Sequence, residues 1–294
     1  MSSAPDGNVL DELLKLLKLE QIEENIFRGQ SQDLGFGTIF GGQVLGQALS
    51  AVSQTVPESR PVHSLHSYFL RHGDPAKPIV YDVDCIRDGS SFTTRRVRAI
   101  QKGRAIFNMS ASFQIRESGF EHQENAPEVP GPDGIESQLE MMRRMAHKIP
   151  EDVRDSYLSE KPIEMRPVDP MNFFAPEKRE PIRYAWFRAI SNLPDDPALH
   201  QYMLAYASDF QLFSISLYPH GQTFWNENLQ TASLDHAMWF HRDFRMDDWL
   251  LYFMHSPNAS GARGMNLGRI YTRDGKLIAS VVQESLMRYY TPKK

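Results

Sequence analysis

The sequence has a single cysteine and no long apolar run. Cys85 alone cannot form a disulfide within the chain or a cysteine-based zinc site, and a lone cysteine is typical of a reducing compartment. No uninterrupted apolar run approaches about 18 residues, and no basic and then apolar leader follows Met1. The C-terminal Thr-Pro-Lys-Lys also differs from the Ser-Lys-Leu peroxisomal address. These absences predict a cytoplasmic protein that neither spans a membrane nor is secreted.

Clustered positive charge is also absent. The chain has 32 Lys and Arg against 37 Asp and Glu, a formal net charge of −5, and no run of Lys or Arg reaches five residues. Nucleic acids and anionic membranes attract proteins through basic patches, so neither partner is predicted. With 41% hydrophobic and 23% charged residues among 294, the composition is that of a soluble protein with room for two units of about 150 residues.

Apolar periodicity predicts two helices and then a sheet in the first part of the chain. Leucines at helical spacing predict a helix over 9–19, with Asp6 as a candidate cap. A second apolar helical face covers 41–56 and ends at Pro57. Segments rich in β-branched and aromatic residues follow, separated by Gly, Pro or Asp-Gly turn signals. They predict antiparallel strands over 62–72, 79–87, 92–101 and 105–115.

The same order recurs after a segment of different composition. Residues 116–180 contain clustered proline and charge around an amphipathic helix predicted over 135–148, and we interpret them as a connection. A long helix is then predicted over 197–217. The strands predicted after it are 230–242, 249–256, 263–272 and 277–288.

The two halves also align with each other without gaps. An offset of 169 residues pairs Ser64 with Ser233 and Gln114 with Gln283. An internal duplication is the economical explanation. Residues 34–57 contain no Asp or Glu, so the first of the paired helices cannot carry a carboxylate.

One acid stands among apolar residues of the predicted helix over 197–217. Helical spacing places Asp209 beside Ala205, Tyr206, Leu212 and Phe213, none of which can form an ion pair with a carboxylate. A lone Asp on a helix is usually solvated, so these neighbours alone leave both a functional and a solvated Asp209 open.

Seven separated motifs occur along the chain in one order. They are "IFRGQSQDLG", "FGGQVLGQAL", "HSLHSYFLRHGD", "DGSSFTTRRVRAIQKG", "HQYMLAYASD", "LDHAMWFHR" and "VQESLMR". Together they resemble the bacterial acyl-CoA thioesterase II family over nearly the whole chain. The resemblance implies an α+β fold, the double hotdog, in which each of two tandem units wraps an antiparallel sheet around a long helix. We place the N-terminal hotdog at 1–115, a linker with a helix at 116–180 and the C-terminal, catalytic hotdog at 181–294.

The resemblance also implies the catalytic group and the reaction. The family uses an Asp on the second hotdog helix, a Thr or Ser on the following strand and a Gln on the last strand, and these fall on Asp209, Ser233 and Gln283. Ser233 keeps the hydroxyl of a Thr but lacks the methyl that would fix its rotamer. The implied reaction is hydrolysis of fatty acyl-CoA to fatty acid and coenzyme A, with no cofactor and no metal. We expect one active site per chain, in a homodimer or homotetramer.

The residue types suit this chemistry. A thioester carbonyl is already electrophilic, so hydrolysis needs a positioned water, removal of its proton and stabilisation of an oxyanion. A carboxylate accepts the proton, a hydroxyl both donates and accepts, and an amide donates. Backbone N–H groups at the helix start beside Gly41 and Gly42 are candidate oxyanion donors, although these glycines could instead permit tight helix packing.

Other residues and functions stay open on the sequence. His63 and His66 are alternative general bases. A hotdog hydratase or dehydratase commonly needs an Asp and a His close together, which Asp209 and His220 do not provide. A non-catalytic acyl-CoA-binding protein is the third function, although such a protein would be expected to lose the polar group. The arginines that could meet coenzyme A phosphates, or lie on solvated faces, are Arg95, Arg96, Arg98, Arg263 and Arg269.

Overall fold

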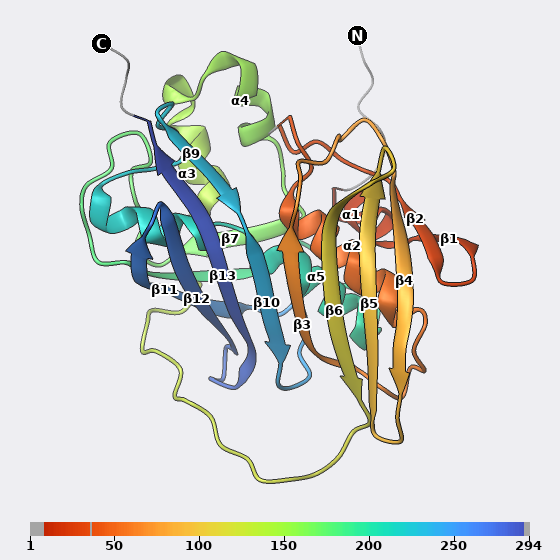
Figure 1. The fold of residues 1–294 in the computed structure, drawn as a ribbon. Coiled ribbons are helices and arrows are strands. Elements are labelled where there is room, and N and C mark those ends of the chain that lie inside the picture. The colour runs from red at the N-terminus through yellow and green to blue at the C-terminus, as the bar shows by residue number, and fades with distance from the viewer. Residues whose placement is uncertain (1–8, 36, 291–294) are drawn as a thin grey trace.

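The strands form one antiparallel sheet in the computed structural model, which describes residues 9–35 and 37–290 (Figure 1). Its strand order is β1-β2-β4-β5-β6-β3-β10-β13-β12-β11-β8-β7, with β9 paired to β13. The first unit contains α1 (Val9–Leu17), β1 (Glu20–Glu23), β2 (Ile26–Gly29), α2 (Gly41–Ser53), β3 (Val62–Phe69), β4 (Ile79–Asp88), β5 (Phe92–Gln101) and β6 (Arg104–Gln114).

The second unit repeats this pattern after a short helical segment. That segment contains α3 (Gln138–Arg144), the 3₁₀ turn η1 (Ala146–Lys148) and α4 (Glu151–Leu158). The second unit contains β7 (Ile163–Pro167), β8 (Ile182–Ala189), α5 (Pro197–Ser208), the 3₁₀ segment η2 (Leu212–His220), β9 (Leu229–Ser233), β10 (Asp235–Phe240), β11 (Leu250–Ser260), β12 (Arg263–Thr272) and β13 (Leu277–Tyr289).

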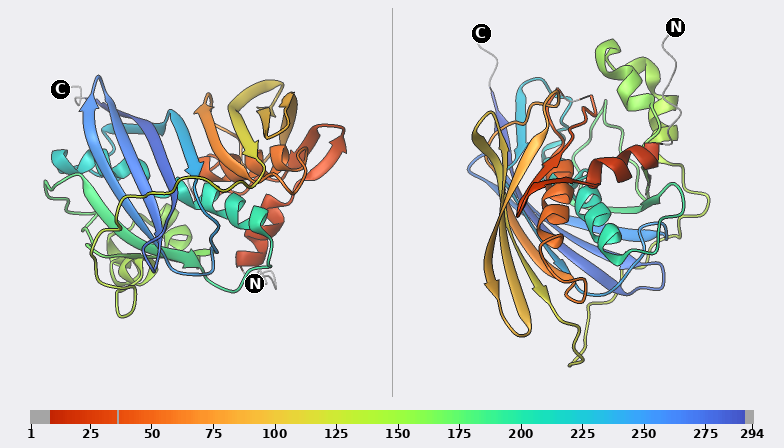
Figure 2. Two further views of the ribbon diagram at one scale, coloured as in Figure 1. Left: turned by 90° about the horizontal axis from the view of Figure 1, so that it is seen from below. Right: turned by 90° about the vertical axis from the view of Figure 1, so that its right-hand side faces the viewer.

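Helices α2 and α5 lie side by side against the same concave face of the sheet (Figure 2). Two glycines one helical turn apart allow this approach, because a Cβ on Gly42 would lie 2.2 Å from the Tyr206 carbonyl oxygen and one on Gly46 would lie 3.0 Å from that of Tyr202. The contacts also show that the two helices run antiparallel. Their apolar faces share one buried core with the inner face of the sheet.

The two units join edge to edge through β3 and β10. These strands pair antiparallel, from Asp235 opposite Tyr68 to Trp239 opposite Ser64. The join leaves no free sheet edge between the units, so the helices of both units are held against a continuous surface. Among the described residues, no helix is both long and apolar enough to cross a membrane.

Periodicity predicted most of these elements. The helices over 9–19 and 41–56 and seven of the eight predicted strands are confirmed, and the helix over 135–148 is present as α3 and η1. The strand predicted over 230–242 is divided into β9 and β10. Ser137 and Glu140 begin α3 with a capping box. The predicted cap Asp6 lies outside the described residues. The elements that were not predicted are β1, β2, α4, β7 and β8, of which α4 and β7 lie within the predicted connection.

The predicted helix over 197–217 is wrong in its second half. Helix α5 ends at Ser208, and Asp209 is its C-cap residue. Gln211 has a left-handed backbone with φ of 62°, which redirects the chain into η2. Asp209 is therefore at a helix end, where a side chain can reach beyond its own helix.

The gapless alignment of the halves is also wrong by two residues, although the repeated architecture supports duplication. The β4–β5 hairpin closes between Gly89 and Phe92, whereas the β11–β12 hairpin closes between Ser260 and Arg263. The offset of 169 paired Ser91, rather than Gly89, with Ser260. Corresponding residues in the two sheets must therefore be found from strand register.

Candidate active site

Asp209 lies at the carboxyl end of α5 and at the amino end of α2. Its side chain accepts a hydrogen bond from the Gly42 N–H, and only 5% of the residue is exposed. The N-cap residue of α2, Phe40, supplies no side-chain acceptor. The carboxylate of the second unit thus caps the helix of the first, and the positive end of that helix stabilises its negative charge.

Gly41 and Gly42 leave room for two different neighbours. A Cβ on Gly41 would lie 2.6 Å from Asp209 Oδ2, whereas one on Gly42 would meet the Tyr206 carbonyl. Gly42 therefore permits helix packing, and Gly41 permits the approach of the carboxylate. The interpretation of tight helix packing therefore applies to Gly42, whereas the role of these backbone N–H groups as oxyanion donors stays a prediction.

We expect Gly41→Ala to lower kcat by roughly tenfold or more while the protein stays folded. The added methyl group would displace the Asp209 carboxylate, and a displacement on the order of 1 Å can cost much of a catalytic rate. The measurement is kcat from thiol release, together with Tm. Gly119→Ala is the control, because a Cβ there meets nothing within 4 Å. Equal kcat in the two variants would show that the carboxylate does not need this space.

Ser233 and Gln283 converge on Asp209 from two strands. Ser233 is the last residue of β9, and its Oγ donates to Asp209 Oδ1 at 3.5 Å. Gln283 is fully buried on β13, and its Nε2 donates to Ser233 Oγ at 2.7 Å. The Gln283 amide also donates to the Asp209 carboxylate. The structure therefore brings together the three residues that the sequence motifs singled out.

Burial shifts the pKa values of Asp209 and of the neighbouring His236. It raises the pKa of Asp209 above its ordinary value, against the opposing effects of His236 and of hydrogen bonds from Gln283, Gly42 and Ser233. Burial also lowers the pKa of His236, which favours the neutral imidazole. A carboxylate with a raised pKa is a stronger base than an exposed one, which suits proton removal from water near neutral pH.

His236 is the member of this site that sequence reasoning missed. It is fully buried on β10, with Nδ1 2.8 Å from Gln283 Oε1 and Nε2 2.9 Å from Ser208 Oγ. It lies in the motif "LDHAMWFHR", where strand alternation puts it on the inner face with Met238 and Phe240. That alternation was the available signal.

The histidines considered from the sequence lie elsewhere. His63 Nε2 is 2.8 Å from Ser112 Oγ, and the ring packs edge-on against Phe92. His66 is exposed and packs edge-on against Trp239. In the part of the chain that the structure describes, no hydrogen bond joins either ring to Asp209, and no group of three or more His, Cys, Asp or Glu is arranged to hold a metal ion.

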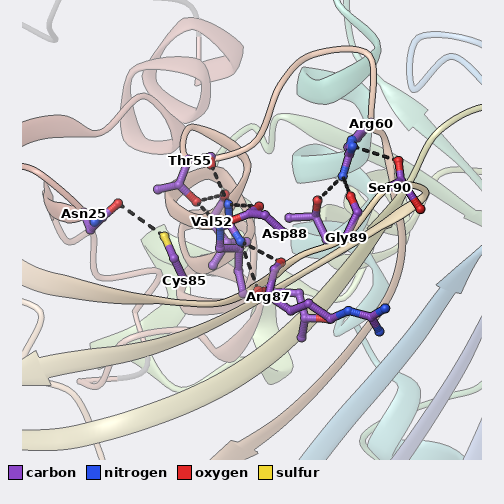
Figure 3. A network of polar contacts seen from close by, with 12 residues as sticks. Asn25, Val52, Thr55, Arg60, Cys85, Arg87, Asp88, Gly89 and Ser90 are labelled. Carbon is purple, nitrogen blue, oxygen red and sulfur yellow. Dashed lines mark hydrogen bonds and ion pairs between the residues drawn. The ribbon is translucent and has the colours of Figure 1, made fainter.

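The five candidate arginines all form ion pairs within the chain. Arg95 is buried, and its guanidinium bonds to Asp88 and to the carbonyl oxygen of Thr55 just beyond α2; Figure 3 shows Thr55, Arg87 and Asp88 of this network. A guanidinium at a helix carboxyl end is a stabilising structural contact. The other four pairs are exposed or partly so: Arg96 with Asp84, Arg98 with Asp82, Arg263 with Glu284 and Arg269 with Glu124.

The described residues of the first unit form no equivalent of this site. Val62 is opposite Phe113 just before an irregularity in β3, as Ser233 is opposite Ser285 just before the break between β9 and β10. From this register, Ser64 and Gln114 are not the counterparts of Ser233 and Gln283. The buried apolar residues that correspond to Ser233, His236 and Gln283 are Val62, Leu65 and Ala111. The C-cap of α2 is the uncharged Gln54.

Comparison with known proteins assigns the family. The profile described as acyl-CoA thioesterase matches residues 152–286, and that described as acyl-CoA thioesterase N-terminal domain matches 30–114. The chain is 43% identical over 283 residues to Acyl-CoA thioesterase 2 of Haemophilus influenzae, covering 96% of this chain and 99% of that one. The chain belongs to the acyl-CoA thioesterase family. Human Acyl-coenzyme A thioesterase 8 is 38% identical over 294 residues, covering 97% of this chain and 91% of that one.

Solved structures place the fold of this thioesterase family member. An acyl-CoA thioesterase II, TesB2 from Mycobacterium marinum, is 41% identical with a TM-score of 0.78, covering 96% of this chain and 100% of that one. A protein with a hot dog fold from Alicyclobacillus acidocaldarius has a TM-score of 0.77 at 19% identity, covering 95% and 99% of the two chains, and this likeness concerns the fold alone. The predicted α+β double hotdog is confirmed.

Proposed function

We propose that this chain hydrolyses fatty acyl-CoA thioesters by attack of a water held by Asp209, Ser233 and Gln283. Membership of the acyl-CoA thioesterase family supports the reaction. The observation that carries the residue assignment is a buried carboxylate bonded to a hydroxyl, an amide and a helix amino end. Phe210 follows Asp209 in the chain, and its ring stacks on that of Phe40 with the centroids 4.6 Å apart, an apolar pair that suits a fatty acyl group.

The proposed mechanism uses each group once. Asp209 accepts a proton as the water oxygen attacks the thioester carbon, while Ser233 and Gln283 orient the water and the carboxylate. The C–S bond then breaks, and the proton passes to the departing sulfur, which gives a fatty acid and free coenzyme A. The amino end of α2, whose Gly42 N–H bonds to Asp209, would also stabilise negative charge that develops next to this carboxylate.

Release of free thiol tests this function. An acyl-CoA is mixed with the protein and a thiol reagent, because hydrolysis releases the coenzyme A thiol whereas hydration or mere binding releases none. Signal from the wild type that is lost in Asp209→Asn supports the proposal. Signal that Asp209→Asn retains would leave hydrolysis in place but remove Asp209 as its base.

The rate should depend on pH through Asp209. Protonated Asp209 cannot accept a proton, so kcat/KM is expected to fall as the pH falls through the pKa of this residue. Because burial raises that pKa, the midpoint should lie above the ordinary value of 3.8. The measurement is kcat/KM against pH.

A neighbouring acid provides the control for this pH profile. Burial also raises the pKa of Asp235, whose Oδ1 accepts a hydrogen bond from the Glu284 N–H at 2.7 Å. Asp235→Asn should keep the acid limb if Asp209 is the base. Loss of the acid limb in Asp235→Asn would show that the limb comes from Asp235 and not from Asp209.

Chain-length preference follows from rates against saturated acyl-CoAs from short to long. Increasing kcat/KM with chain length would support a fatty acyl substrate.

Cytoplasmic location and assembly as a homodimer or homotetramer stay predictions from the sequence.

A further inference from the structure

A continuous line of side chains leads from the end of α5 to Asp209. Ser208 Oγ is 2.9 Å from His236 Nε2, and His236 Nδ1 is 2.8 Å from Gln283 Oε1. Gln283 Nε2 then donates to Ser233 Oγ, which donates to Asp209 Oδ1. Ser208, His236 and Gln283 are all fully buried, so each polar atom depends on its neighbour in this line.

The Gln283 amide has only one useful orientation. A carboxylate accepts hydrogen bonds and repels a carbonyl oxygen, so the amide must face Asp209 with its NH₂ group. Its oxygen then faces His236, which has to donate from Nδ1. If Nδ1 carried no proton, it would favour the reversed amide, and the Gln283 oxygen would face Asp209 and Ser233.

We propose that His236 is a positioning residue that holds the Gln283 amide with its NH₂ group toward Asp209, Ser233 and the attacking water. This inference rests on the proposed function of those three residues. A neutral imidazole that donates from Nδ1 accepts at Nε2, and the Ser208 hydroxyl is the group placed to donate there. Each hydrogen bond along the line then runs in the same direction, from Ser208 to Asp209.

A fourth strand, β11, holds the backbone of Ser208. Tyr252 on β11 donates its hydroxyl to the Ser208 carbonyl oxygen at 2.8 Å, and Tyr252 is fully buried. The Ser208 hydroxyl also lies 2.9 Å from the Ala205 carbonyl oxygen, a second acceptor for its one proton. The charged groups that act on His236 are Asp209 and Asp235. Among the described residues, no charged group from another element acts on the protonation of His236.

The first unit shows that the fold itself does not require an imidazole at this place. Leu65 corresponds to His236 and Ala111 to Gln283, and both are buried in the same kind of inner sheet row. An apolar pair thus fills the equivalent space without polar atoms to satisfy. Burying an imidazole and an amide without hydrogen bonds destabilises a fold. Packing alone therefore does not explain why His236 and Gln283 are polar.

Two amide variants separate positioning from packing. Asparagine at 236 places its NH₂ group near the site of the imidazole Nδ1, whereas glutamine places its NH₂ group near the site of Nε2. His236→Asn is therefore expected to keep kcat within a few-fold of wild type. His236→Gln and His236→Leu are expected to lower kcat by roughly ten- to a hundredfold, with KM changed by no more than about twofold.

Two further readouts distinguish positioning from loss of structure. His236→Leu removes both the electrostatic effect of His236 and the amide donor, each of which lowers the pKa of Asp209, so its acid limb of kcat/KM should move to higher pH. Ser208→Ala keeps the imidazole and therefore isolates the part that comes from the amide. In a Gln283→Ala background, His236→Leu should have almost no additional effect, because its target is already absent. Ser208→Ala removes the donor to Nε2 and serves as a second variant if His236→Leu does not fold. It should lower kcat severalfold and move the acid limb of kcat/KM in the same direction.

The outcomes separate this inference from the proposed function. Equal losses in His236→Asn and His236→Gln, an unmoved acid limb, or a full additional loss in the Gln283→Ala background would overturn the positioning role. If Asp209→Asn is inactive while His236→Leu keeps wild-type kcat, only this inference fails. If Asp209→Asn keeps wild-type turnover, the proposed catalytic group itself fails.

Discussion

Asp209→Asn is expected to lower kcat by roughly a hundredfold or more and to raise the Tm of the protein near neutral pH. Asparagine has the same shape and keeps one accepting oxygen, which can serve the Ser233 hydroxyl, but its NH₂ group is a donor and it cannot take a proton from water. The loss should appear in kcat measured by thiol release. A folded Asp209→Asn protein with near-wild-type turnover would show that another group is the base.

The sign of the stability change follows from the raised pKa. Because burial raises the pKa of Asp209 in the folded state, the ionised carboxylate destabilises the folded protein at pH values above that pKa. The neutral amide avoids this cost, so the gain in Tm should be largest near neutral pH and should shrink as the pH falls toward the ordinary Asp value of about 3.9. Thermal unfolding of both proteins across this range gives the measurement. A lower Tm for the variant at neutral pH would contradict this account.

Gln283→Ala is expected to reduce kcat by about two orders of magnitude, whereas Gln114→Ala should leave kcat within a few-fold of wild type. Gln283 donates to both Ser233 and Asp209 inside the site. Gln114 donates to Glu117 at the far end of β6 and is a matched control of the same residue type. Equal losses from the two substitutions would show that the loss in Gln283→Ala does not come from its hydrogen bonds to Ser233 and Asp209.

Adding Ser233→Ala to Gln283→Ala should cost little more than Gln283→Ala alone. Residues that hold one water act as a unit, and losses within such a unit are strongly non-additive. Titration with a tight acyl-CoA analogue should correspondingly give one catalytic equivalent per chain. Fully multiplicative losses would show that Ser233 and Gln283 act independently.

Sequence periodicity predicted the strands and the two central helices because their apolar faces repeat over enough residues to be distinct. It did not show that α5 stops at Ser208, because apolar residues continue through η2 and the left-handed residue is Gln211 rather than a glycine. The short strands β1 and β7 also have too few residues for a clear alternation.

Local pattern singled out Asp209 but left its role open, and motif resemblance supplied that role together with Ser233 and Gln283. Alternation places His236 on the inner face of β10, but only the paired strands and α5 bring Gln283 and Ser208 to its two ring nitrogens. The counterparts of Ser233 and Gln283 were misassigned because a gapless alignment ignores bulges and hairpin closure. Contacts between distant strands depend on register, which is a three-dimensional property.

The hydrogen bond between Asp209 and Gly42 gives the two copies of the ancestral unit a division of labour. The second unit contributes the proposed base and its partners, whereas the first contributes the start of α2, whose Gly42 N–H bonds to that carboxylate. On the proposed mechanism, neither unit alone would hold the whole site. The first unit has apolar residues at the corresponding places, so the point at which α2 begins is what this unit brings to the carboxylate of its neighbour.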